Sequence, residues 1–84
     1  ICLCGSRILV EKSIYPRFRD ALLEKVKQLK VGDPLEPDTQ QGALVSLEHQ
    51  QKVLSYIELA KEEGGTVLCG GHAVKPPGRC NNGW

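Results

Sequence analysis

The sequence predicts an α/β fold built around one β-α-α-β unit, with parallel strands and helices packed on the sheet. Two observations support this prediction. Short apolar and β-branched runs lie near both ends of the chain, and two helical hydrophobic patterns lie between them. The chain has 84 residues, which is at most one small domain, and a chain of this size buries only about 60 to 65% of its unfolded surface. Its hydrophobic core is therefore expected to give only marginal stability.

The first strand is expected over residues 7–11, an apolar run with charged ends. A helix follows, with Ser13 as its N-cap and Pro16 in the first turn, where a missing N–H is harmless. Its apolar stripe comprises Ile14, Phe18, Leu22, Val26 and Leu29. The helix should continue through Lys30, and Gly32 should end it in the left-handed conformation.

Residues 33–42 contain two prolines and a glycine, so they are expected to form a turn-rich connection. Ser46 should begin a second helix that stops at the pair Gly64 and Gly65. The apolar face of this helix comprises Leu47, Val53, Leu54, Ile57 and Ala60. A second buried strand is expected over residues 66–69, followed by a polar tail. The glycines after this strand lack the spacing of a phosphate-binding loop.

Composition narrows the function classes. Apolar residues make up 40% and charged residues 25% of the chain, which excludes a disordered or collagen-like protein. Eleven basic and ten acidic residues give a net charge of +1, so we expect neither a nucleic acid nor a membrane as partner. The apolar run at residues 8–10 is far too short for a membrane span or a signal-peptide core. The expected location is therefore cytoplasmic.

Four cysteines call for separate treatment, and in a cytoplasmic protein they are expected to be reduced. Cys2 and Cys4 are too close to pair well with each other. Together with Cys69 and Cys80 they lack the spacing of a zinc site, so no metal is expected. Cys69 is expected in the core and Cys80 on the surface. The chain begins at Ile1 and contains no Met, which suggests a piece of a longer protein.

Residues 1–7, Ile-Cys-Leu-Cys-Gly-Ser-Arg, resemble the active-site cysteine signature of the aldehyde dehydrogenase superfamily, with the nucleophile at Cys2. Residues 31–35, followed by residues 38–39 and 42–46, resemble a second motif of that family in the same order and spacing. Most members have Gly-Pro where this chain has Gly42 and Ala43. That departure is similar to the subgroup acting on 2-hydroxymuconic and 2-aminomuconic semialdehydes, as is the Ile-Cys-Leu-Cys order.

The resemblance implies that residues 1–84 are a fragment of the catalytic (thiol) domain, with the dinucleotide-binding domain outside this chain. In the implied mechanism, Cys2 attacks an aldehyde, the thiohemiacetal passes hydride to NAD (or NADP), and a Glu-activated water hydrolyses the thioester to the acid. The oxyanion is held by the Cys2 backbone N–H and an amide supplied from elsewhere. Alone, the fragment should be inactive. Related enzymes are usually dimers or tetramers, so a homo-oligomer is expected.

Two further residues are candidates for contact with the cofactor. His49 and Lys52 stand where related enzymes use a Gln and a Lys to reach a ribose of NAD. Lys52 is the better match of the two, because the family residue at the His49 position is different. The alternative is that both are simply exposed surface residues.

Two other functions remain open from the residues. The chain could be a stand-alone, non-catalytic α/β interaction or metal-binding module with structural cysteines, which would require it to fold alone. Two short strands and two helices would then leave a sheet face and an edge uncovered. A thiol-redox module would need Cys2 and Cys4 to form a reversible pair, which their spacing strains.

Overall fold

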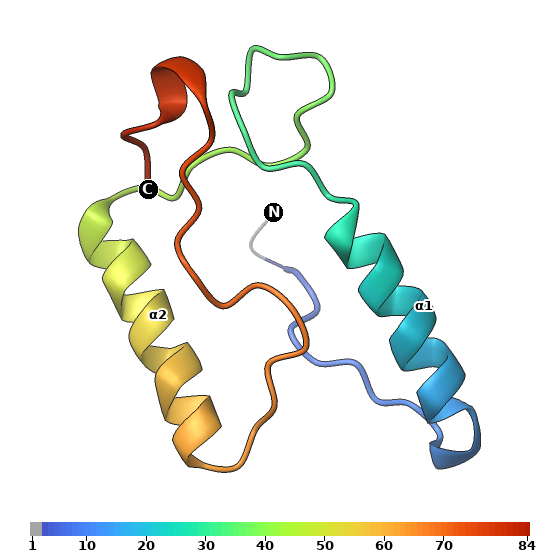
Figure 1. Cartoon of the computed structure of the whole chain (residues 1–84). Helices are drawn as coiled ribbons and strands as arrows, with labels where there is room; N and C mark the ends of the chain where they lie inside the picture. The colour runs from blue at the N-terminus through green and yellow to red at the C-terminus, as the bar shows by residue number, and fades with distance from the viewer. Residues whose placement is uncertain (1–2) are drawn as a thin grey trace.

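The computed structural model describes residues 3–84. Its elements are the 3₁₀ turn η1 (Lys12–Ile14), helix α1 (Tyr15–Lys27), helix α2 (Leu47–Glu62) and the 3₁₀ turn η2 (Gly78–Cys80). The molecule extends over 45 × 30 × 25 Å. Long, largely extended connections therefore separate the two helices from each other and from both ends of the described chain (Figure 1).

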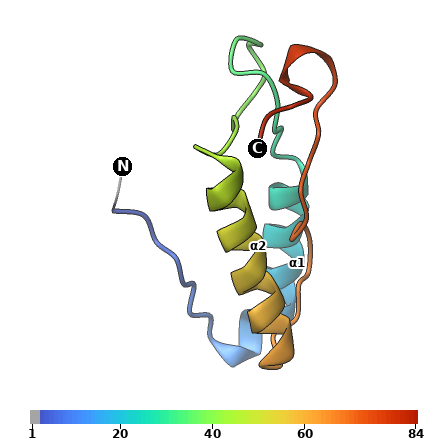
Figure 2. The same cartoon turned by 90° about the vertical axis from the view of Figure 1, so that its left-hand side faces the viewer.

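The two helices do not pack directly against each other. Instead, the extended segment 66–75 passes between them, with α1 on one side and α2 on the other (Figure 1). Segment 3–11 stands away from this layer, as Figure 2 shows, and the side chains of Leu3 and Leu9 in it are 92% and 96% exposed. The described chain is thus an open layer with one arm beside it.

Helix α1 starts later and ends earlier than the sequence predicts. Ser13 lies inside η1 and does not cap α1; its hydroxyl donates to the Glu11 carboxylate, and no side chain caps the helix. Pro16 does lie in the first turn, as predicted. The helix ends at Lys27, and the backbone N–H of Gln28 donates to carbonyls of the last turn. Tertiary pairing of the next residues, described below, takes the chain out of the helix before Lys30.

The prediction that Gly32 ends the helix in the left-handed conformation is wrong. Positive φ angles occur at four other glycines, and Gly32 is not one of them. Gly32 is buried in the connection, and its N–H donates to the carbonyl of Gln41 over 3.0 Å. The backbone of Lys30 likewise accepts from Gln40 and Gln41, so loop pairing replaces a helix cap here.

Helix α2 forms as predicted. The Ser46 hydroxyl accepts a hydrogen bond of 3.1 Å from the backbone N–H of His49, which satisfies one of the free donors of the first turn. At the other end Gly64 has a φ of 97°, and the N–H of Gly65 donates to the Ala60 carbonyl over 2.7 Å. This is the arrangement in which a left-handed glycine closes a helix.

The two predicted strands are not formed within residues 3–84. Segments 7–11 and 66–69 are extended but unassigned, and the one β-bridge is an isolated parallel pair between Val31 and Gln41. A strand needs a neighbour about 4.8 Å away to pair its N–H and C=O groups. Because segment 3–11 stands apart from the helical layer, neither segment finds a neighbour in the described chain (Figure 2). The predicted β-α-α-β unit is therefore unconfirmed.

No hydrophobic side chain among residues 3–84 is buried. The predicted stripe on α1 remains between 37% and 47% exposed (Ile14, Phe18, Leu22, Val26 and Leu29). Cys69 and Cys80 are both half-buried, so Cys69 is less buried and Cys80 is less exposed than the sequence predicts. Neither helix of the described chain has both the length and the apolar character needed to cross a membrane.

Candidate functional site

The predicted nucleophile, Cys2, lies outside the described residues. The first cysteine that the structure describes is Cys4, which is exposed on the arm that stands away from the helices (Figure 2). The predicted cofactor contacts lie elsewhere, in the first turns of α2. The described part of the chain therefore does not bring the cysteine segment and the α2 face into one enclosed site.

His49 and Lys52 are three residues apart on α2, so their side chains leave neighbouring positions on one face of the helix. Both are exposed, and no hydrogen bond or ion pair within residues 3–84 engages either side chain. Their backbones are fixed: the His49 N–H is bonded to Ser46, and the Lys52 carbonyl accepts from the Ser55 hydroxyl over 2.7 Å. The two exposed side chains therefore project from a backbone that local hydrogen bonds hold in place.

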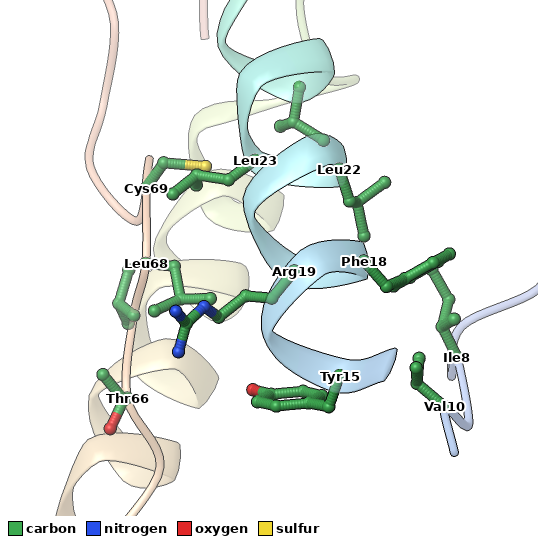
Figure 3. A pocket seen from close by; sticks show the side chains of 12 residues that line it. Ile8, Val10, Tyr15, Phe18, Arg19, Leu22, Leu23, Thr66, Leu68 and Cys69 are labelled. Atoms are coloured by element: carbon green, nitrogen blue, oxygen red, sulfur yellow. The ribbon is translucent and has the colours of Figure 1, made fainter. Parts of the chain in front are cut away.

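A second feature is an open apolar groove of about 350 Å³ between α1, segment 66–69 and the arm. Figure 3 shows Phe18 and Leu22 on the side of α1 near Ile8, whereas Leu23 lies on the side near Cys69. Among the described residues that line it, Arg19 alone carries a charge; its guanidinium lies 5.7 Å from the centre of the Tyr15 ring. The groove is therefore suited to contact with an apolar segment that makes one polar contact, to Arg19.

A third feature joins two segments that are far apart in the sequence. Asp33, in the loop between the helices, accepts hydrogen bonds from both Nε and Nη2 of Arg79, which lies 46 residues later, and the Nη2 bond is 2.8 Å. Asp33 also accepts from the Leu35 N–H over 2.9 Å. The Arg79 contact, followed by the Leu35 N–H, lowers the pKa of Asp33 to about 2, and Asp33 in turn raises the pKa of Arg79.

The loop that contains Asp33 is also tied within itself. The Lys30 ammonium lies 2.6 Å from the Asp38 carboxylate, and this contact lowers the pKa of Asp38. The Lys30 N–H donates to the Gln40 side chain over 3.0 Å. The sequence predicted a turn-rich loop here but gave no sign of its partner, because nothing local connects Asp33 to an arginine 46 residues away.

The pH dependence of the Asp33–Arg79 contact can be stated with its sign. The pKa of Asp33 is lowered in the folded state, so the contact adds stability above about pH 5 and loses it as the pH falls through 3.8 toward 2. For the full-length protein, we expect the urea unfolding midpoints of the wild type and of Asp33→Asn to differ by a constant amount between pH 5 and 8. Below about pH 4 the difference should narrow. An equal difference at pH 3.5 and pH 7 would contradict the assignment.

The comparison with known families concerns the whole chain. Residues 1–84 match the model of the "Aldehyde dehydrogenase family". The chain belongs to the aldehyde dehydrogenase family. The family predicted from the two sequence motifs is thereby confirmed.

Curated relatives and solved structures agree with this assignment. The chain is 55% identical over 71 residues to the 2-aminomuconic 6-semialdehyde dehydrogenase of a Pseudomonas species, covering 84% of this chain and 14% of that protein. It is 43% identical over all 84 residues to the acetaldehyde dehydrogenase of Pseudomonas aeruginosa, covering 17% of that protein. The betaine aldehyde dehydrogenase of Staphylococcus aureus, solved with NAD⁺, matches 96% of the chain and 16% of its own length with a TM-score of 0.81 and 43% identity.

Two consequences follow from these relatives. The fold of this chain is that of part of an aldehyde dehydrogenase, although its own described residues form only helices. The chain spans between 14% and 17% of the length of the curated relatives above.

The described residues offer no group of metal ligands, because no three His, Cys, Asp or Glu side chains come together within residues 3–84.

Proposed function

We propose that residues 1–84 are part of the catalytic domain of an NAD(P)-dependent aldehyde dehydrogenase that oxidises an aldehyde to a carboxylic acid. The observation that supports this most directly is the family match over the whole chain. The likeness to a Staphylococcus aureus betaine aldehyde dehydrogenase solved in complex with NAD⁺ supports the choice of cofactor. A solved structure of a P449M variant of that relative carries a BME-modified cysteine.

In this proposal Cys2 supplies the nucleophile. Its thiolate sulfur forms a bond to the aldehyde carbon, and the carbonyl oxygen becomes an oxyanion that accepts a hydrogen bond from the Cys2 backbone N–H. NAD, when bound, takes up the hydride that leaves this carbon. Cys2 then holds the acyl group as a thioester until water releases the acid and returns the thiolate. The general base and the second oxyanion donor lie outside residues 1–84.

The residues present fit one part of NAD, a ribose, and not the whole dinucleotide. Lys52 and His49 have exposed side chains on adjacent turns of α2, with no competing ion pair in the described chain. Their spacing allows each to reach a different hydroxyl of one sugar. The remainder of the cofactor must be held by other parts of the enzyme.

Replacing Lys52 with methionine in the full-length enzyme should raise the KM for NAD by about three- to tenfold with little change in kcat. The reason is that one solvent-exposed hydrogen bond contributes roughly 0.5 to 1.5 kcal/mol to binding, and it holds the cofactor equally before and during the reaction. Initial rates at varied NAD concentration would measure this. Lys25→Met, a similar change on α1, serves as control; an equal rise in both variants would contradict a role for Lys52.

The fold of the full-length enzyme follows from the same proposal. Segments 7–11 and 66–69 are extended, and apart from the Glu11 carbonyl, which accepts from the Ile14 N–H, their backbone groups make no backbone hydrogen bond in the described chain. They are therefore available to pair as strands with neighbours outside it. Such a sheet would also cover the groove on α1, which residues 3–84 leave open. Cytoplasmic location and a dimer or tetramer remain predictions for that enzyme.

A semialdehyde of the 2-aminomuconic or 2-hydroxymuconic type is the proposed substrate, supported by the 55% identity to a 2-aminomuconic 6-semialdehyde dehydrogenase. The test is NADH formation by the purified full-length protein, with this semialdehyde, acetaldehyde and betaine aldehyde compared at equal concentration. We expect the highest kcat/KM with the semialdehyde. If only acetaldehyde gives NADH, the proposed substrate is wrong. If no aldehyde gives NADH, the proposed function is wrong.

A further inference from the structure

The tail of the chain, residues 76–84, is fastened to the loop between the helices at two points. At the first point, Arg79 in η2 donates two hydrogen bonds to Asp33. At the second, the backbone N–H of Leu44 donates to the Trp84 carbonyl over 2.7 Å. The tail and the loop lie side by side in both views (Figures 1 and 2). An open cavity of about 390 Å³ lies between them and is lined by residues of both segments.

The two points lie in different parts of the loop. Asp33 lies six residues after the end of α1, directly after the Gly32 backbone that pairs with Gln41. Leu44 is at its end, two residues before Ser46, the N-cap of α2. The tail therefore bridges the loop, and through Leu44 it holds the chain two residues before the N-cap of α2.

The Arg79 contact orients the tail relative to the loop more than it stabilises the fold. Its side chain is 61% exposed, so solvent weakens the charge attraction, whereas Asp33 is only 16% exposed. Two parallel donors on one carboxylate nevertheless fix both the distance and the orientation of the two segments, which a single ammonium group would not do. The third bond, from the Leu35 N–H, holds the Asp33 side chain in place on the loop.

We infer that Arg79 is a positioning residue for the cofactor-binding face of α2. By holding the tail across the loop, the Arg79–Asp33 contact and the Leu44–Trp84 bond together fix the position of the N-terminal end of α2 relative to the tail, and hence where Lys52 and His49 project. This inference rests on the proposed function, because it assigns the consequence of the clamp to NAD binding. Arg79 itself touches neither Lys52 nor His49 within the described chain.

The test uses the full-length enzyme with Arg79→Gln. This change keeps a similar side-chain volume but removes the positive charge and the two parallel N–H donors of the guanidinium. The KM for NAD should rise by about three- to tenfold, the KM for the aldehyde and kcat should be unchanged, and Arg79→Lys should fall between wild type and Arg79→Gln. Lys75→Gln is the matched control, because it removes a charge directly before the tail, at an exposed side chain that makes no hydrogen bond or ion pair within residues 3–84. Thermal unfolding of each variant shows that it is folded.

Charge reversal keeps the inference testable if Arg79→Gln does not fold. Asp33→Arg and Arg79→Asp should each raise the KM for NAD, and the double variant should recover part of the loss, since the attraction returns while the Leu35 bond does not. A KM for NAD in Arg79→Gln equal to that of Lys75→Gln, or a double variant no better than its parents, would overturn the inference. A wild-type enzyme that forms no NADH from any aldehyde would instead overturn the proposed function, and the inference with it.

Discussion

Replacing Cys2 with alanine should abolish aldehyde oxidation by the full-length enzyme, lowering kcat/KM by at least about a thousandfold. The proposed reaction passes through a bond between the Cys2 sulfur and the aldehyde carbon, and alanine has no atom that can form it. The measurement is initial-rate NADH formation under saturating NAD. Binding of NAD, measured by fluorescence titration, should be retained, because the proposed cofactor contacts lie on α2.

The other cysteines provide the controls for this experiment. Cys4→Ala, two residues away, and Cys69→Ala, half-buried beside Leu23 in the groove, should keep most of the activity (Figure 3). A brief reaction with a thiol reagent, followed by peptide mapping, should label Cys2 first and respond to NAD. If Cys4→Ala abolishes activity while Cys2→Ala does not, the nucleophile has been assigned to the wrong thiol.

The sequence predicts those parts of this fold that depend on local interactions. Helix α2 is defined by a serine cap and a glycine stop, both of which act within one turn of the backbone, and both are found where predicted. The apolar spacing on α1 likewise identified that helix. Its C-terminal limit was missed, because the pairing of Lys30 with Gln40 and Gln41 is tertiary and has no signature in the helix itself.

Strands and long-range contacts are the parts that the sequence could not supply. An extended segment becomes a strand only when another segment pairs with it, and residues 7–11 and 66–69 find no such partner in the described chain. The Asp33–Arg79 contact was missed for a similar reason, since opposite charges 46 residues apart carry no information about their distance in space. The candidate residues on α2 came from the family resemblance and not from any local pattern.

The isolated 84-residue chain should neither unfold cooperatively nor oxidise an aldehyde. Although 40% of its residues are apolar, no hydrophobic side chain among residues 3–84 is buried, and burial is the main term that offsets the loss of chain entropy on folding. Scanning calorimetry should show no two-state transition, and gel filtration should show an expanded or aggregated species. The full-length enzyme under the same conditions is the control.

This experiment also separates the two functions that the sequence left open. A stand-alone α/β interaction or metal-binding module must fold by itself, with or without an added metal such as zinc. A sharp, reversible transition of the isolated chain, near-UV circular dichroism typical of fixed aromatic side chains, or a large stabilisation by zinc would favour that module. An expanded chain, insensitive to zinc, would instead place the missing core in the remainder of an aldehyde dehydrogenase, with the groove on α1 as the surface that this remainder covers.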